Sequence, residues 1–303
     1  MNAQQKYLRY TWFVLIMVFL VIIAGGVVRM TQSGMGCPDW PRCFGRWIPP
    51  TSADQLPADF EKYLSKQDID NSFNAYHTWI EYINRLLGAL LGVFIFIHFI
   101  WTWRKFRSNR AVLLLSFLLL LAVGFQGWLG KKVVDHNLAV VKITTHMLVA
   151  LVIAAIPLMI IYRLKERSAI NDRGLRNLSL IALVLILAQV VLGTQIREQI
   201  DEISKSLQYT QRELWIGRLD QNFLFHRSFS WVILLACLWV YWRSRPYPEL
   251  RNLSILIVML VLLTVLVGTI MMWWHIPAIA QPLHLLLASM LTLAVFTVRL
   301  RLK

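Results

Sequence analysis

The sequence predicts an all-α membrane protein whose eight transmembrane helices form two repeated four-helix bundles. Hydrophobic residues make up 57% of the 303-residue chain, and its mean hydropathy is +0.56. Apolar runs long enough to cross a bilayer core of about 30 Å recur along the sequence. In addition, motifs found in the first four runs return in the last four, which is typical of membrane proteins built from repeats.

Eight apolar runs are long enough to be membrane spans. They cover residues 11–30, 78–103, 111–130, 139–162, 177–196, 220–242, 252–272 and 279–298. The first run is longer than the apolar core of a signal peptide and lacks a small-residue cleavage site, so we expect it to be a retained span.

Basic residues gather on one side of the predicted membrane. The N-terminus, the loops 104–110, 163–176 and 243–251, and the tail 299–303 carry 17 Lys and Arg but three acidic residues. The positive-inside rule therefore predicts that both termini are cytoplasmic. Topology explains most of the net charge of +15. Nucleic-acid binding is not indicated, because the charge is divided among short loops that flank the membrane.

Two of the three cysteines lie in the first outer loop, residues 31–77. Cys37 and Cys43 are six residues apart, and the prolines between them favour turns. On an oxidising surface such a pair more often forms a disulfide than a metal site. A redox-active pair is the alternative. Cys237 lies within the sixth span, where we expect a packed apolar residue.

An internal repeat relates the two halves of the chain. It pairs the glycine-containing segments 25–29 and 193–197, Asn84 with His226, Gly127 with Gly268, and His146 with His284. Because four spans separate the halves, both have the same orientation in the membrane. The sequence therefore predicts two parallel bundles, residues 1–170 and 171–303, each able to hold a ligand between facing helices.

His226 and His284 are the candidate ligands of a haem. Each lies one to two turns inside the outer end of its span, where a polar imidazole needs a partner. Two imidazoles at matching depth on different helices can hold an iron porphyrin from both faces. His146 is the counterpart of His284, whereas the counterpart of His226 is Asn84, a poor iron ligand. The first half would thus hold a haem through one histidine.

The other histidines are interpreted as hydrogen-bonded or interfacial residues. They are His77, His98, His136 and His275.

Glu81 lies three residues before Asn84, so both share one helix face. A carboxylate near the membrane interior is costly unless it is paired or used. Glu81 could neutralise Arg85 at i+4, or it could transfer a proton or stabilise a developing cation beside a substrate. Arg85 and Arg227 lie near the outer ends of their spans, where they could snorkel to lipid headgroups or bind haem propionates, because they adjoin the two proposed sites.

Residues 25–43, the element from Glu81 to Arg85, and the later histidines together resemble the haem A synthase family. The resemblance covers nearly the whole chain. It implies an eight-span membrane enzyme that oxidises a methyl substituent of haem O to the formyl group of haem A, for use in terminal oxidases. It also implies that His226 and His284 ligate a retained haem b, that Glu81 is catalytic and that His146 faces the substrate haem.

Two features depart from the family pattern. Family members usually have a histidine where this chain has Asn84, which argues against bis-histidine ligation of the substrate haem. Some members also have a second cysteine pair in the outer loop of the second half, whereas residues 197–219 contain none. A second disulfide would therefore be dispensable here.

Two other classes of function remain as alternatives. A haem b-binding electron-transfer subunit without a substrate haem should have two histidines for each haem and no reactive carboxylate. A transporter would need a polar path through the membrane midplane, where these spans are mostly apolar. Glu81 and the open ligand position favour the enzyme, whose oxygen could come from water or from dioxygen.

The resemblance also implies the surroundings of the protein. We expect a multi-pass protein of the bacterial cytoplasmic (inner) membrane, in contact with lipid, that takes haem O as substrate. Haem O synthase and an electron acceptor of unidentified nature are the expected partners, and a homo-oligomer is compatible with the sequence.

Overall fold

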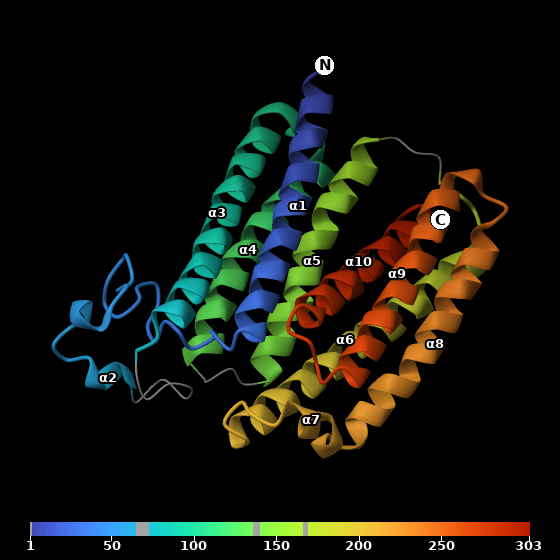
Figure 1. Cartoon of the computed structure of the whole chain (residues 1–303). Helices are drawn as coiled ribbons and strands as arrows, with labels where there is room; N and C mark the ends of the chain where they lie inside the picture. Colours follow the sequence, from blue (N-terminus) through green and yellow to red (C-terminus); the bar gives the residue numbers. More distant parts are fainter. Residues whose placement is uncertain (1, 65–72, 136–139, 166–168) are drawn as a thin grey trace. The chain divides into compact units, whose positions relative to one another are not determined.

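The computed structural model describes every residue except 1, 65–72, 136–139 and 166–168, and the described part is mostly helical (Figure 1). Among the described residues, eight helices are long and apolar enough to cross a membrane. They are α1 (Ala3–Met30), α3 (Ala75–Phe106), α4 (Arg110–Asp135), α5 (Val140–Leu164), α6 (Arg173–Ser206), α8 (Gln221–Ser244), α9 (Pro248–Trp273) and α10 (Ala280–Leu300). The predicted all-α, eight-span fold class is confirmed.

Side-chain caps fix where four of the spans begin. Asn2 and Asn74 cap α1 and α3, and Asp172 and Asp220 cap α6 and α8, each accepting a backbone N–H of the first turn. Such caps satisfy donors that have no partner within the helix. At the start of α6 the N–H of Leu175 lowers the pKa of the Asp172 carboxyl, because it stabilises the ionised form.

The helices are longer than the predicted spans, because hydropathy detects the apolar part of a helix and misses its polar ends. The largest difference is at α6, which continues to Ser206 instead of ending at residue 196. Residues 197–206 were therefore wrongly assigned to a loop. An ion pair at i+4 between Arg197 and Asp201, with N···O 2.7 Å, supports this extension. Its apolar side, at Ile200, packs in a buried cluster with Trp215 of the short helix α7 (Arg212–Trp215).

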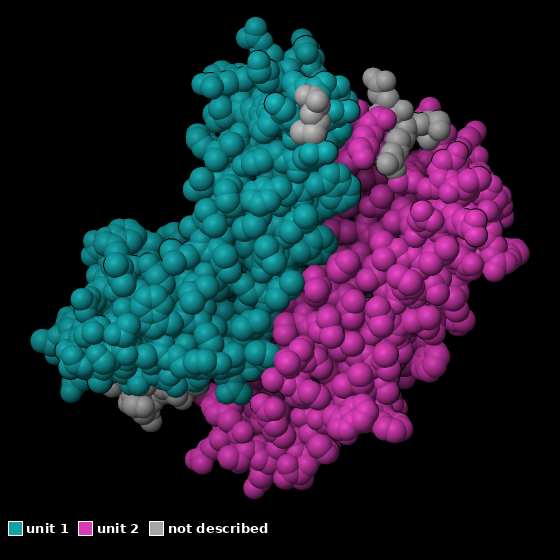
Figure 2. Space-filling view, turned by 45° about the horizontal axis from the view of Figure 1, so that its top comes forward, with its two compact units in different colours: residues 1–157 teal, residues 158–303 magenta. Residues whose placement is uncertain are grey.

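The chain divides into two compact units, which Figure 2 distinguishes by colour. Unit 1 is residues 1–157 and unit 2 is residues 158–303. The division falls within α5, next to Pro157 in the helix interior. The repeat in the sequence placed the boundary at residue 170, in the connection that follows this helix.

Unit 2 is a four-helix bundle. Helix α8 packs against α6 and α9, and α10 packs against the same two helices, so α8 and α10 lie across the bundle from each other. An apolar core extends through it, from Leu175 of α6 to Val298 of α10. Cys237 is a fully buried member of this core, as expected. Facing helices in such a bundle can hold a ligand between them.

In unit 1, α3 packs against both α1 and α4. His98 of α3 is completely buried between these helices. Its Nε2 lies 3.1 Å from the hydroxyl of Thr11 in α1, and its Nδ1 lies 3.0 Å from the hydroxyl of Ser116 in α4. Both ring nitrogens therefore have partners, which confirms the interpretation of His98 as a hydrogen-bonded structural residue.

Candidate functional site

In unit 2, two histidine rings each face a glycine on the neighbouring helix. A methyl group at Gly193 of α6 would lie 3.2 Å from Cε1 of His226 in α8. A methyl group at Gly268 of α9 would lie 3.2 Å from Cε1 of His284 in α10. A larger residue would push against the ring in both places, so each glycine leaves the space that an imidazole needs.

Unit 1 has one such pair of a histidine ring and a facing glycine, and this pair shows that the predicted repeat was aligned in the wrong register. A methyl group at Gly130 of α4 would lie 3.6 Å from Cε1 of His146 in α5, whereas one at Gly127 would meet no described atom within 4 Å. The predicted pairing of Gly127 with Gly268 is therefore wrong by three residues. Gly130 and Gly268 each precede their histidine by 16 residues, and they are the structural counterparts.

Two glutamines hold the helices that carry these histidines. Nε2 of Gln189 in α6 donates a 2.9 Å hydrogen bond to the backbone oxygen of His226. Nε2 of Gln126 in α4 donates a bond of the same length to the backbone oxygen of His146. Each glutamine lies four residues before the glycine that faces the same histidine, on the same side of its helix. Neither glutamine was predicted as a site residue, although the spacing Gln-x-x-x-Gly recurs in the third and fifth spans.

The residues of unit 2 fit an iron porphyrin. Nδ1 of His226 and Nδ1 of His284 are buried and have no hydrogen-bond partner in the described part of the chain. Buried polar atoms in proteins nearly always have a partner, so these rings are suited to an added ligand. Their positions on opposite helices, α8 and α10, match axial ligation from two faces.

The residues of unit 1 offer one imidazole and one amide. Nδ1 of His146 is buried and has no partner among the described atoms, and the same holds for Oδ1 of Asn84 in α3. A methyl group at Gly25, the repeat counterpart of Gly193, would meet no described neighbour within 4 Å. Asn84 therefore does not contact Gly25 in the way that the His226 ring contacts Gly193. An amide oxygen can accept a hydrogen bond there, but it is a poor ligand for haem iron.

Glu81 is buried, with 4% of its surface exposed, and its carboxylate binds two groups. Arg85 forms an ion pair with it one helical turn away, in which Nε donates to Oε1 at 3.1 Å. The backbone N–H of Cys37 in the outer loop donates to Oε2 at 2.8 Å. The structure thus contains the Arg85 pairing that the sequence offered as one alternative. It adds a contact that the sequence did not indicate, between this carboxylate and the loop.

The two arginines proposed for propionates are in different situations. Arg85 donates hydrogen bonds to the backbone oxygen of Cys37 at 2.8 Å, to that of Arg42 at 3.1 Å and to that of Asp39. Arg227 is exposed, and its Nη1 lies 4.0 Å from the sulfur of Met272 in α9. Arg85 would have to exchange loop contacts to bind a propionate, whereas Arg227 is more accessible.

Cys37 and Cys43 form a disulfide with an S–S distance of 2.00 Å, which confirms the predicted bond. A tight turn follows, in which Phe44 and Gly45 have positive φ angles of 54° and 73°. The turn is closed by backbone bonds between Cys43 and Arg46 in both directions, at 2.9 and 3.1 Å. Two consecutive residues with positive φ are typical of a type I′ turn, in which glycine is favoured.

Gly36 brings this loop into direct contact with the backbone of α3. A methyl group at Gly36 would lie 2.3 Å from the backbone oxygen of His77 and 2.8 Å from the nitrogen of Thr78. The Thr78 hydroxyl donates a 2.9 Å hydrogen bond to the backbone oxygen of Gly36. Glycine is therefore required for the close approach that places Cys37 beside Glu81.

We expect Gly36→Ala to lower the free energy of unfolding by about 1–3 kcal/mol, because the added methyl group overlaps backbone atoms that cannot rotate away. Thermal unfolding of the purified protein in detergent would measure the change. Gly217→Ala is the matched control, since a methyl group there would meet no described atom within 4 Å. Equal melting temperatures for the two variants would contradict this account of the contact.

The remaining histidines do not join these sites in the structure. His77 lies in the first turn of α3, and the helix is continuous from there to Asn84, a distance of about 10 Å along the axis. His275 is exposed in the connection between α9 and α10. His136 lies outside the described residues.

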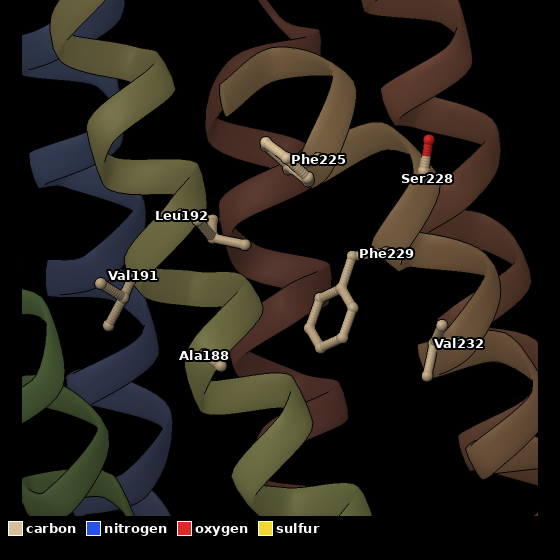
Figure 3. Close-up of a pocket in the computed structure, with 7 residues that line it drawn as sticks. All are labelled: Ala188, Val191, Leu192, Phe225, Ser228, Phe229 and Val232. Atoms are coloured by element: carbon tan, nitrogen blue, oxygen red, sulfur yellow. The ribbon is translucent and has the colours of Figure 1, made fainter. Parts of the chain in front are cut away.

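An apolar pocket of about 750 Å³ lies between α6 and α8 in unit 2. Its lining residues are Ala188, Val191 and Leu192 of α6, and Phe225, Ser228, Phe229 and Val232 of α8. Figure 3 shows the Phe229 ring in the space between the two helices. Phe225 is 63% exposed, so the pocket opens on the outer surface of the helix pair. None of the lining side chains is an imidazole, thiol or carboxylate that could ligate iron.

Comparisons with known proteins agree over most of the chain. The family described as Cytochrome oxidase assembly protein matches residues 8–296. The Heme A synthase of Rickettsia bellii is 25% identical over 330 residues, which covers 95% of this chain and 96% of the relative. The Heme A synthase of Flavobacterium johnsoniae is 24% identical over 315 residues, which covers 91% and 92%. The Heme A synthase of Shewanella oneidensis is 28% identical over 193 residues, and that match spans 61% of this chain and 56% of the relative.

Proposed function

Because the chain belongs to the haem A synthase family, we propose that it converts haem O to haem A by oxidising one methyl substituent of the porphyrin to a formyl group. The observation that supports this most is the inequality of the two candidate sites. The candidate site of unit 2 has two histidines, His226 and His284, whereas that of unit 1 has His146 and Asn84. A retained cofactor benefits from ligands on both faces, but a substrate must enter and its product must leave.

Unit 2 would hold haem b as a cofactor, with His226 and His284 as its axial ligands. The unsatisfied Nδ1 atoms and the glycine facing each ring support this assignment. A bound haem b would supply one-electron redox chemistry. Arg227 follows His226 in the sequence and is exposed, so its guanidinium is suited to binding a propionate through charge-assisted hydrogen bonds.

Unit 1 would bind the substrate, haem O. His146 would contact its iron from one face, and Asn84 would lie towards the other, where its unsatisfied oxygen can accept a hydrogen bond from water. The substrate iron would then be five-coordinate or water-ligated, and haem O would bind more weakly than haem b. Arg85 would assist at the propionates if it exchanges its loop carbonyls for a carboxylate.

Glu81 would act on the reacting methyl group. It lies less than one helical turn from Asn84, so both side chains emerge on the same side of α3. A carboxylate there can accept a proton or stabilise positive charge that develops at the methyl carbon. Arg85 and the N–H of Cys37 would keep the carboxylate in a fixed orientation. Oxygen supplied by water and oxygen supplied by dioxygen are both compatible with this role.

The proposed location is the bacterial cytoplasmic membrane, with both termini on the cytoplasmic side as the basic loops indicate. Haem O is an apolar molecule, so it would reach unit 1 through the lipid bilayer, directly from haem O synthase or by diffusion. If water supplies the oxygen, an electron acceptor is also required, because oxidation of a methyl group to a formyl group then releases electrons; if dioxygen supplies it, dioxygen itself takes up electrons.

The test of the function is chemical identification of the haems. The protein would be expressed together with haem O synthase in membranes that otherwise lack haem A, and the extracted haems would be separated by chromatography and identified by mass. We expect haem A in the membranes and haem b in the purified protein. Unchanged haem O beside bound haem b would contradict the proposal and favour an electron-transfer subunit.

The coordination of the substrate iron gives a further prediction. Wild-type protein reconstituted with haem O should show a high-spin signal in electron paramagnetic resonance, because Asn84 is a poor iron ligand. Asn84→His should make that signal low-spin, and His146→Ala should alter it. A second bis-histidine signal in the wild type that disappears in His77→Ala would overturn the assignment, since α3 would then have to unwind for His77 to reach the iron.

A further inference from the structure

We infer that Gln189 and Gln126 are positioning residues that hold a histidine of each unit in place for its haem. Gln189 would position His226 for the cofactor, and Gln126 would position His146 for the substrate haem. This inference rests on the proposed haem sites. It adds two residues that belong neither to the sequence motifs of the family nor to the proposed iron ligands.

The geometry is the same in both units. The carboxamide nitrogen donates to the backbone oxygen of the histidine at 2.9 Å, although the two partners are 37 residues apart for Gln189 and 20 residues apart for Gln126. One turn further along the same helix, a glycine leaves room for Cε1 of the imidazole. The hydrogen bond therefore fixes the backbone of the histidine, and the glycine determines how closely its ring approaches the helix.

The orientation of each carboxamide depends on this contact. Oε1 of Gln126 and Oε1 of Gln189 are both buried without a partner among the described residues. The carboxamide nitrogen of each glutamine therefore makes the hydrogen bond, and the backbone oxygen of the histidine is its acceptor. Burying an unpaired amide oxygen is unfavourable, so retaining a glutamine at both places needs an offsetting contribution.

The helix pairs α1–α3 and α9–α10 show that the hydrogen bond from a glutamine to a histidine backbone accompanies particular histidines. Val21 lies four residues before Gly25 in α1, and the repeat counterpart of His226 in α3 is Asn84, so this pair has neither the glutamine nor the histidine. Thr264 lies four residues before Gly268 in α9, and its hydroxyl donates to Leu260 of its own helix. Each unit thus has one histidine whose backbone is held by a glutamine, and in unit 1 it is the proposed axial ligand, His146.

A purely structural role makes different predictions from a positioning role. A hydrogen bond between two membrane helices also stabilises their packing, whether or not a haem is present. Losing such a bond lowers thermal stability but leaves the signal of a correctly ligated haem unchanged. Losing a positioning contact changes the orientation of the imidazole, and this changes the low-spin signal and the midpoint potential of the haem.

The experiment compares Gln189→Met with Gln126→Met, because methionine has a similar length and no donor. In purified holoprotein without added haem O, we expect Gln189→Met to shift the low-spin signal of haem b and to raise its dissociation about three- to tenfold, as expected for one hydrogen bond. Gln126→Met should leave haem b unchanged. After titration with haem O, Gln126→Met should weaken its binding by a similar factor, and Gln189→Met should not.

Gly193→Ala and Gly130→Ala keep the test informative if a methionine variant does not fold. The methyl group in Gly193→Ala would lie 3.2 Å from the His226 ring, and the one in Gly130→Ala would lie 3.6 Å from the His146 ring, an ordinary contact. We therefore expect Gly193→Ala to shift the haem b signal more than Gly130→Ala alters the binding of haem O.

Two results would overturn the inference, and they are distinguishable. If His226→Ala loses haem b while both methionine variants and Gly193→Ala keep wild-type haem signals and affinities, the glutamines only join helices. If the wild type contains no haem b, or His226→Ala retains its signal, the proposed cofactor site itself fails, and the positioning role of Gln189 fails with it.

Discussion

His226→Ala and His284→Ala should each remove most of the haem b that is retained by the purified protein. Each variant loses one of the two proposed axial ligands. The remaining five-coordinate haem should be high-spin and should dissociate more readily. Removing a residue that only supports a metal ligand lowers metal affinity about 10- to 100-fold. Removing a ligand itself should lower the affinity for haem b by more than this. Haem content after extraction and the low-spin signal in electron paramagnetic resonance would measure the effect.

His275→Ala is the matched control for these two variants. His275 is exposed in the connection between α9 and α10, so its loss should leave haem content unchanged. His146→Ala should also retain haem b, because it lies in unit 1 and faces Gly130. If both His226→Ala and His284→Ala keep a wild-type low-spin spectrum, the ligand assignment is wrong.

The spans could be predicted because length and hydropathy are local properties of the sequence. Their ends could not, since a helix continues wherever its backbone hydrogen bonds and side-chain contacts persist. In the part of α6 that extends to Ser206, Ile200 packs in a buried cluster with Trp215, a residue of the separate helix α7. A hydropathy pattern contains no information about that contact.

The register of the repeat shows a similar limit. Helix α4 has glycines at positions 124, 127 and 130, and their spacing of three places them near one face of a helix. Any of them could therefore match Gly268 by sequence. The contact with His146 identifies Gly130 as the counterpart, and this contact depends on how α4 and α5 are placed against each other.

The candidate site was predictable where the chemistry lies in the side chain itself. An imidazole or a carboxylate in an apolar span is conspicuous, so His226, His284, His146 and Glu81 could be selected from the sequence. Gln126 and Gln189 were not selected, because each binds a backbone oxygen and every residue carries one. The hydrogen bond from Cys37 to Glu81 was not predicted for a similar reason, because its donor is a backbone N–H.

The contact between Glu81 and Cys37 gives Glu81 two separable roles, a chemical one at the substrate and a mechanical one in holding the loop. Glu81→Gln separates them, because glutamine keeps an acceptor for the Cys37 N–H and loses the negative charge. Tyr82→Phe is the matched control for the mechanical role. The Tyr82 hydroxyl donates to the backbone oxygen of Trp47, so its removal also weakens attachment of the loop to α3.

We expect Glu81→Gln to retain haem b and the Cys37–Cys43 disulfide while conversion of haem O falls by about 10²-fold or more, or stops at a hydroxylated product. This is the range in which a proton-transferring side chain contributes to catalysis, and a neutral amide can neither accept the proton nor stabilise a cation. Tyr82→Phe should keep most of the activity, since it changes the loop and leaves the charge in place. The measurement is the yield of haem A and of hydroxylated haem after extraction, at equal haem b content.

Wild-type conversion by Glu81→Gln would reduce Glu81 to a structural partner of Arg85. An equal loss in both variants would show that the carboxylate acts through the loop, because loss of its charge weakens its hold on Arg85, which binds the loop carbonyls of Cys37 and Arg42.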